Sequence, residues 1–120
     1  MSSIFEQEDS FGSGVYARRG MAIVRGAGTT VWDENGRPYL DCAAGIGVAN
    51  VGHCHPQVVA AITAQASQLI TCQEMFYNDR RAALLERLAG LAPAGLRRLF
   101  LSNSGAEAIE AALKFARLST

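Results

Sequence analysis

The chain has 120 residues, 49% of them hydrophobic, and its 11 basic side chains balance its 11 acidic ones. This balance excludes a long-range field that would favour nucleic acid or anionic lipid, and no apolar run reaches the roughly 20 residues that a bilayer span needs. The first ten residues are polar and acidic, unlike a secretory signal, and three widely spaced cysteines favour a reducing cytoplasm over a disulfide framework. We therefore expect a cytoplasmic protein of one domain at most, with neither nucleic acid nor membrane as a partner.

Residues 21–41 have the pattern of a small antiparallel meander. Two β-rich runs, 22–24 and 29–32, flank a glycine-rich turn, and residues 39–41 supply a third short strand. Between the second and third runs, Asp33–Gly36 predicts a hairpin turn, because an Asn-Gly pair tolerates the positive φ angles that such turns require.

Two helices are expected after a glycine-rich connection. Residues 42–52 are small and apolar, which indicates close packing or the lining of a site. A helix is predicted from Pro56, since proline is favoured at the first helical position. A second helix is predicted from Asn78, a good N-cap residue, to the break at Ala92-Pro93.

The end of the sequence contains a predicted strand, a tight turn and a helix. Arg98–Ser102 predicts a short apolar strand, Asn103–Gly105 a turn, and Ala106–Leu118 a helix in which Glu110 pairs with Lys114. This order is typical of an α/β architecture. One strand cannot form a parallel sheet by itself, so we expect the chain to be a truncated part of a larger protein.

The turn Ser104–Ala106 is the main candidate for an anion site. A helix that begins directly after a strand presents free backbone N–H groups and the positive end of its dipole. Gly105 leaves room for a phosphate, and the Ser104 hydroxyl is an additional donor. Ser104 and Glu107 also have the spacing of a capping box, so a well-capped helix start explains the same residues, and the two roles compete for the hydroxyl. The stretch lacks the lysine of a Walker loop and the spaced glycines of a dinucleotide fingerprint.

Several motifs occur in a specific order along nearly the whole chain: Gly26-Ala27-Gly28 with Val31-Trp32-Asp33, Gly36 with Tyr39-Leu40-Asp41, Gly45-Ile46-Gly47-Val48, Gly52-His53-Cys54-His55-Pro56, Asn103-Ser104-Gly105-Ala106-Glu107-Ala108 and Ala112-Leu113-Lys114-Phe115-Ala116-Arg117. This order resembles the class III pyridoxal-phosphate-dependent aminotransferases. Within the class, Ser13–Tyr16, Ile23–Gly26 and Gly47–Asn50 are most similar to acetylornithine transaminases and to the aminoadipate-semialdehyde transaminases of lysine biosynthesis.

The resemblance implies an α/β fold of the fold-type I, aspartate-aminotransferase-like kind, of which the chain would be the amino-terminal portion only. Residues 1–50, with the meander, would be the amino-terminal segment of the small domain, and residues 51–120 would begin the large cofactor-binding domain. It further implies a homodimer whose cofactor is pyridoxal 5′-phosphate. The phosphate of that cofactor would be held at Ser104, Gly105 and Ala106, largely through backbone N–H groups.

The same resemblance implies two substrate-binding residues, Tyr16 and Ile46. Tyr16 matches a substrate-contacting aromatic of the family, although a tyrosine packed on the small domain would explain it as well. Ile46 stands where ornithine-type members have an aromatic residue, so it leaves more room for an N-acylated or larger substrate. Other ω-amino substrates would fit that room too.

No catalytic residue is expected among these 120, and no metal site. Lys114 is the only lysine, and its pairing with Glu110 on an exposed helix face is unsuited to a desolvated catalytic amine. The Schiff-base lysine of the family is therefore expected beyond Thr120. His53-Cys54-His55 could suggest a metal, but adjacent residues rarely all face one ion, and no second ligand pair has zinc spacing.

The expected function of the complete protein is transfer of the terminal amine of an N-acylated or carrier-bound ornithine or lysine precursor to 2-oxoglutarate, in arginine or lysine biosynthesis. The lysine-pathway form implies an amino-group carrier protein as a further partner. Ornithine or 4-aminobutyrate transamination is the alternative within the enzyme class. A chain of only these 120 residues is expected to be inactive, and a non-catalytic fragment is the hypothesis from outside that class.

Overall fold

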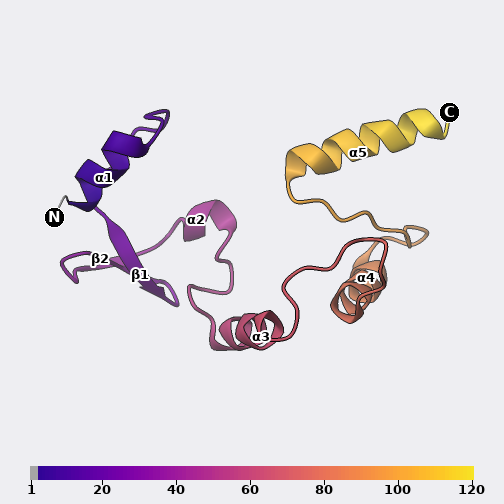
Figure 1. Ribbon diagram of the computed structural model, residues 1–120, viewed down its shortest axis with the longest axis horizontal. Coiled ribbons are helices and arrows are strands. Elements are labelled where there is room, and N and C mark those ends of the chain that lie inside the picture. Colours follow the sequence, from indigo (N-terminus) through magenta and orange to yellow (C-terminus); the bar gives the residue numbers. More distant parts are fainter. Residues whose placement is uncertain (1–2) are drawn as a thin grey trace. The chain divides into compact units, whose positions relative to one another are not determined.

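A computed structural model describes residues 3–120, which form two compact units, 3–70 and 71–120. The first unit runs from indigo to magenta in Figure 1, and the second from dark pink to yellow. No helix in residues 3–120 is both long enough and apolar enough to cross a membrane.

The first unit begins with a helix, α1 (Ile4–Phe11), that the sequence pattern did not indicate. Ser3 caps it by a capping box. The Ser3 hydroxyl oxygen accepts from the backbone N–H of Glu6 at 3.2 Å, and the Glu6 carboxylate accepts from the backbone N–H of Ser3 at 2.8 Å. This reciprocal pairing satisfies two donors that a helix start leaves without partners.

A three-stranded antiparallel sheet follows, with β1 (Ile23–Ala27), β2 (Thr30–Asp33) and β3 (Pro38–Leu40) in sequence order. Figure 1 shows β1 and β2 crossing the unit below α1. The β-rich runs and the two turn sequences thus predict this meander correctly. A bulge lies between Ile23 and Arg25, where the register with β2 shifts by one residue.

Asp33 fixes the hairpin between β2 and β3. Its side chain is buried, with 5% of the residue exposed, and its carboxylate accepts from the backbone N–H groups of Asn35 (3.0 Å) and Arg37 (2.8 Å) and from the Tyr39 hydroxyl (2.9 Å). Burial acts to raise the pKa of Asp33, but these three hydrogen bonds and the Arg37 charge outweigh it and hold the pKa below its ordinary value. Gly36 completes the turn with φ of 79°.

Two helical segments complete the first unit. The glycine-rich connection contains one short turn, α2 (Ala44–Gly47), and α3 spans Pro56–Ala66 with proline in its first turn, as the sequence predicts. An isolated antiparallel bridge joins Gly28, in the turn after β1, to His53, just before α3.

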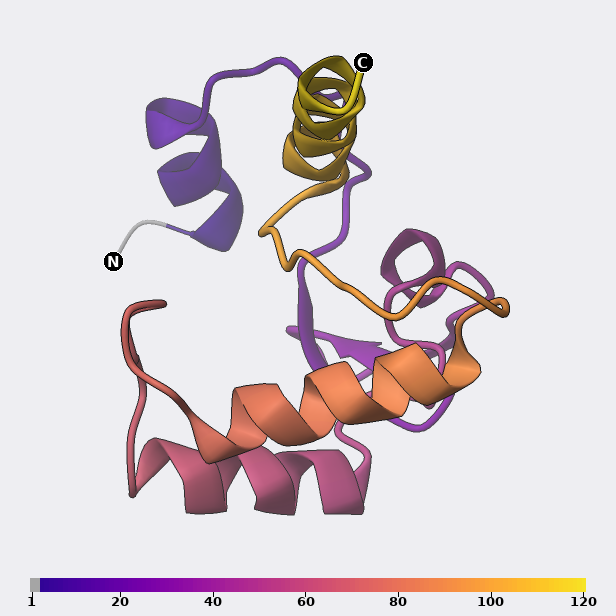
Figure 2. The ribbon, with the colours of Figure 1, turned by 90° about the vertical axis from the view of Figure 1, so that its right-hand side faces the viewer.

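The second unit contains α4 (Asp79–Leu91) and α5 (Gly105–Leu118). The Asn78 side chain caps α4 by accepting from the backbone N–H of Arg81 at 3.0 Å, as expected. The predicted strand at Arg98–Ser102 is wrong, because this segment has no strand hydrogen bonds. Figure 2 shows it as a plain orange connection between α4 and α5. An apolar run forms a strand only where a neighbouring strand pairs with its backbone, and residues 71–120 supply none.

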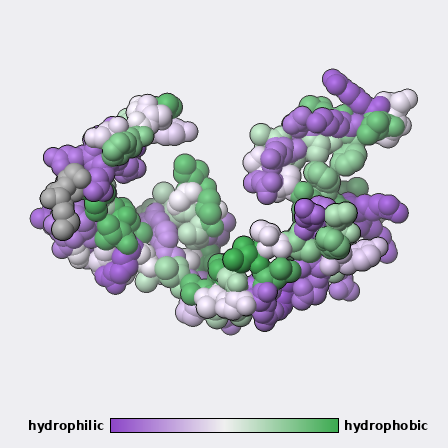
Figure 3. Space-filling model, viewed as in Figure 1, coloured by the Kyte–Doolittle hydropathy of each residue, from purple (hydrophilic) through white to green (hydrophobic). Residues whose placement is uncertain are grey.

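Neither unit encloses a hydrophobic core. Among the hydrophobic residues of 3–120, Ala22 alone is buried. Large apolar side chains of every helix are exposed, and Figure 3 shows hydrophobic residues in green on the surface of both units. The described structure is therefore held mostly by local contacts within the helices, the turns and the meander.

The division into a small-domain segment 1–50 and a large-domain segment 51–120 stays a prediction.

Candidate functional site

Two side chains, Ser104 and Glu107, accept hydrogen bonds from backbone N–H groups at the start of α5. The Ser104 hydroxyl oxygen accepts from the backbone N–H of Glu107 at 3.3 Å, as the capping-box spacing predicts. The Glu107 carboxylate, however, accepts from the backbone N–H of Asn103 at 2.7 Å, one residue before the cap. The Ser102 hydroxyl donates to the Ser104 carbonyl at 3.3 Å. These bonds hold residues 102–107 in a fixed turn ahead of the helix.

Three donors of this turn are available to an anion. The N–H groups of Gly105 and Ala106 have no hydrogen-bond partner within residues 3–120. Ser104 accepts from Glu107 with an oxygen lone pair, so its O–H can still donate. Capping and phosphate binding are therefore compatible, contrary to the expected competition. A Cβ built on Gly105 would meet no atom within 4 Å, so the space in front of the turn is open. This donor set suits a phosphate group.

Lys114 lies on α5, two to three helical turns beyond Gly105. Its ammonium forms an ion pair with the Glu110 carboxylate at 2.8 Å, and its side chain is 69% exposed. The predicted i,i+4 pair is thus confirmed. An exposed, paired ammonium at this position lacks the desolvation that a nucleophilic lysine requires.

The glycine-rich connection contains a left-handed turn. The four residues of α2 have φ angles of 48° at Ala44, 63° at Gly45, 62° at Ile46 and 75° at Gly47. Left-handed geometry costs about 1–2 kcal/mol at each residue that carries a Cβ, and β-branched side chains adopt it least readily. Ile46 is nevertheless 96% exposed, so burial within residues 3–70 does not offset this cost. The other expected substrate residue, Tyr16, lies in the connection between α1 and β1 and is 83% exposed.

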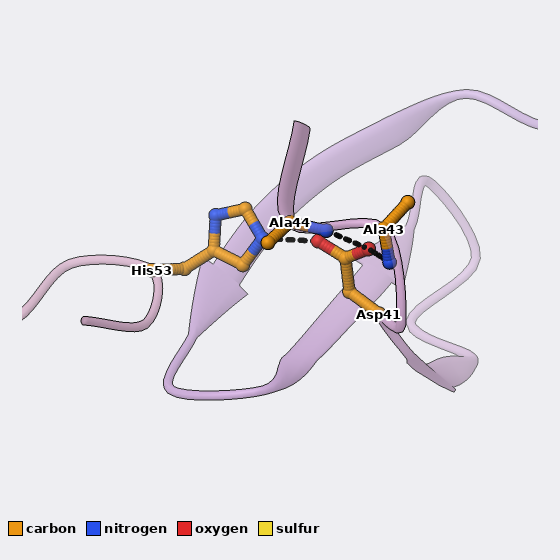
Figure 4. Close-up of polar contacts among 4 residues, drawn as sticks. All are labelled: Asp41, Ala43, Ala44 and His53. Carbon is orange, nitrogen blue, oxygen red and sulfur yellow. Dashed lines mark hydrogen bonds and ion pairs between the residues drawn. The ribbon is translucent and has the colours of Figure 1, made fainter. Parts of the chain in front are cut away.

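Asp41 and His53 form a contact that the sequence analysis missed. Figure 4 shows the Asp41 carboxylate between the His53 ring and the backbone of Ala43 and Ala44. One carboxylate oxygen accepts from the His53 Nε2–H at 2.6 Å, and the other accepts from the N–H groups of Ala43 and Ala44, both at 2.9 Å. The His53 hydrogen bond, followed by the two backbone bonds, lowers the pKa of Asp41.

Asp41 and His53 belong to motifs quoted above, but they are 12 positions apart, and no local pattern pairs them.

Among residues 3–120, no three His, Cys, Asp or Glu side chains lie close enough together to bind a metal ion. All three cysteines are free.

Comparison with known proteins identifies the family. The family model of the class III aminotransferases matches residues 15–120. The chain belongs to the class III aminotransferases. Pyridoxal 5′-phosphate is the cofactor of this family, and the fold is that of the fold-type I aminotransferases.

Individual relatives show how similar the chain is to particular transaminases. It is 52% identical, over 94% of its length, to the [LysW]-aminoadipate semialdehyde transaminase of Deinococcus radiodurans, of which it covers 26%. It is 44% identical, over 98% of its length, to the acetylornithine aminotransferase of Methanosarcina acetivorans, of which it covers 29%. Among solved structures, the ornithine aminotransferase of Toxoplasma gondii matches 94% of the chain with a TM-score of 0.86 and 39% identity, and 26% of that protein is covered.

This class III aminotransferase chain thus spans between a quarter and a third of its relatives' length and corresponds to their amino-terminal part. The turn Ser104–Ala106 belongs to the unit 71–120, whereas Tyr16 and Ile46 belong to the unit 3–70. That these residues meet in one active site stays a prediction.

Proposed function

We propose that the complete protein transfers the terminal amine of an N-acylated or carrier-bound ornithine or lysine precursor to 2-oxoglutarate, in arginine or lysine biosynthesis. The observation that carries this proposal is the similarity to relatives with two such activities, at 52% and 44% identity over more than nine tenths of the chain. A carrier protein that presents the substrate belongs to the lysine-pathway form of the proposal.

In the proposed enzyme, the turn before α5 holds the cofactor phosphate. The N–H groups of Gly105 and Ala106 and the hydroxyl of Ser104 are the donors, and the positive end of the α5 dipole adds to the attraction. When bound, pyridoxal 5′-phosphate supplies the electron sink and carries the amino group. The 14-residue helix gives these donors a rigid support. The lysine that binds the cofactor is proposed to lie outside these 120 residues, because Lys114 is exposed and pairs with Glu110.

Tyr16 and Ile46 are proposed to contact the amino donor. Both side chains are strongly exposed, and neither makes a hydrogen bond or ring contact within the part of the chain that the structure describes. An aliphatic residue at position 46 leaves space for an acyl group or a carrier attachment next to the substrate chain. A hydrophobic wall of this kind discriminates substrates by shape rather than by hydrogen bonds.

The complete enzyme is further proposed to be a cytoplasmic homodimer. Free cysteines at positions 42, 54 and 72 suit a reducing compartment. The connection before α4 contains exposed Met75 and Tyr77, and methionine and tyrosine are both enriched at subunit interfaces.

Assays of the complete enzyme with N-acetylornithine, ornithine, 4-aminobutyrate and the carrier-bound lysine precursor, each with 2-oxoglutarate, test the proposal. We expect kcat/KM for one of the two blocked donors to exceed that for free ornithine by about tenfold or more, the scale on which a shaped pocket discriminates. Equal values for blocked and free donors would contradict the proposed substrate class. Preference for free ornithine would support the alternative that the similarity to the Toxoplasma ornithine aminotransferase favours.

A further inference from the structure

The left-handed turn of α2 presents Ile46 away from the rest of its unit. Four consecutive residues have positive φ, and two of them, Ala44 and Ile46, carry a Cβ. Backbone bonds close the turn, from the N–H of Gly47 to the carbonyl of Ala43 at 2.9 Å and from the N–H of Val48 to the carbonyl of Ala44 at 2.8 Å. A strained conformation persists only where neighbouring groups fix it, so the contacts around this turn determine where Ile46 lies.

Asp41 fixes the entry to the turn. Its carboxylate accepts from the N–H groups of Ala43 and Ala44, which are the last residues before Gly45, and so sets the direction in which the left-handed turn begins. The side chain of Asp41 is 16% exposed, so the carboxylate is partly shielded from solvent. Its second oxygen accepts from the His53 Nε2–H and makes no other hydrogen bond within residues 3–70.

His53 is itself held in place by the sheet. Its backbone exchanges two hydrogen bonds with Gly28, at 2.9 and 2.8 Å. A Cβ on Gly26 would lie 2.8 Å from the His53 ring, so the ring occupies the space that this glycine leaves. Gly52, at φ of 90°, lets the chain approach Gly28 closely, since a Cβ there would lie 3.0 Å from the Gly28 Cα. A continuous series of contacts therefore links the sheet to the turn through His53 and Asp41.

We propose that Asp41 and His53 are positioning residues that act through Ile46: they set the orientation of the left-handed turn and thereby the choice of amino donor. The inference rests on the proposed function and deepens it, since it assigns specificity to residues that need not touch the substrate. Three observations support it: the strain at Ile46, the exposure of its side chain, and the anchoring of the turn to the sheet through one carboxylate.

The test uses the complete enzyme and the ratio of kcat/KM for N-acetylornithine to that for ornithine. Asp41→Ala removes all three contacts of the carboxylate and is expected to change this ratio about tenfold. Asp41→Asn keeps an oxygen that accepts from Ala43 and Ala44, so it should retain most of the wild-type ratio. Asp79→Ala is the matched control, because Asp79 is exposed and lies in the other unit.

A double-mutant cycle separates positioning from a general structural role. In the Ile46→Ala background, Asp41→Ala should change the ratio no further, because the group through which it acts is absent. Lowered thermal stability or lowered kcat for both donors, with an unchanged ratio, would overturn the inference. If Asp41→Ala does not accumulate folded, His53→Ala replaces it, and an unchanged ratio in His53→Ala would overturn the inference. An inactive wild type with every donor would instead overturn the proposed function, and this inference with it.

Discussion

At the scale of single residues, Ser104 and Gly105 have one observed role and one proposed role. Ser104 caps α5 with an oxygen lone pair, and its O–H is proposed to donate to the cofactor phosphate. Gly105 has no positive φ and no crowding neighbour within residues 3–120, so nothing in the described structure requires a glycine there. Under the proposed function, a glycine at this position leaves open the space in front of the turn for the cofactor phosphate.

Replacement of Gly105 by leucine in the complete enzyme should weaken pyridoxal 5′-phosphate binding without unfolding the protein. The side chain would enter the open space that the anion needs, and we expect the Kd to rise about tenfold or more, equivalent to about 1.4 kcal/mol. Gly90→Leu is the matched control, because Gly90 is also helical, exposed and free of crowding atoms. Spectroscopic titration of the cofactor measures the effect, and equal Kd values for Gly105→Leu and wild type would contradict the assignment.

Replacement of Ser104 by aspartate separates the two roles. Aspartate is a good N-cap, so the stability of α5 should stay within about 0.5 kcal/mol of wild type. Its charge would face the cofactor phosphate, and the Kd for the cofactor should rise about tenfold. Ser104→Ala loses the cap as well and should cost about 1 kcal/mol of stability. Thermal unfolding and cofactor titration together give both quantities. Unchanged cofactor affinity in Ser104→Asp, together with lowered stability in Ser104→Ala, would leave capping as the only role.

At the scale of elements, local chemistry predicts helix starts better than strands. Ser104, Asn78 and Pro56 each mark a helix start correctly, because capping involves neighbours three residues away at most. The apolar run at 98–102 is a wrong prediction, since a strand needs a partner that sequence neighbours do not provide. The β2–β3 hairpin was predictable because its strands are joined by a turn that its own residues encode.

The β2–β3 hairpin should lose stability at acid pH. Folding lowers the pKa of Asp33, so its stabilising contribution is complete above the ordinary value of 3.8 and is lost as the pH falls below that value, through the lowered pKa of the folded state. The Tyr39 hydroxyl that donates to Asp33 has a raised pKa and stays protonated across this range. Asp41, whose pKa is also lowered, adds a loss of the same sign.

Amide hydrogen exchange at Asn35 and Arg37 in the complete enzyme, corrected for intrinsic rates, measures this effect. Protection should be constant above about pH 5 and should decrease below pH 3.8. In Asp33→Asn the decrease should be much smaller, because the amide does not titrate. Protection that is independent of pH in the wild type would show that Asp33 does not stabilise the turn.

At the scale of the whole molecule, exposed apolar surface dominates. Ala22 is the only buried hydrophobic residue of 3–120, while α5 exposes Ile109, Leu113 and Phe115. The T-shaped contact between Phe100 and Phe115, with ring centroids 5.6 Å apart, is a small exception. Burial of apolar area is the dominant favourable term in folding, and these 120 residues bury little of it among themselves.

A polypeptide of residues 1–120 alone should therefore not unfold cooperatively. Its helices and turns lack a shared core, so heating should give a broad circular-dichroism transition without a calorimetric peak. The exposed apolar faces should bind a hydrophobic dye such as ANS, as loosely packed states do. A sharp calorimetric transition and no dye binding would contradict this expectation.

The sequence alone determined the family, the meander and the capped helix starts, including the turn before α5, because motif order and hydrogen bonds between near neighbours depend on residues close together in the chain. Only the tertiary structure decided the left-handed turn at Ile46, the pairing of Asp41 with His53, and the freedom of the Ser104 proton. The Asp41–His53 pair requires the chain to return past Gly28 before the two side chains meet. Such a return depends on close approach between segments distant in sequence, which no local pattern encodes.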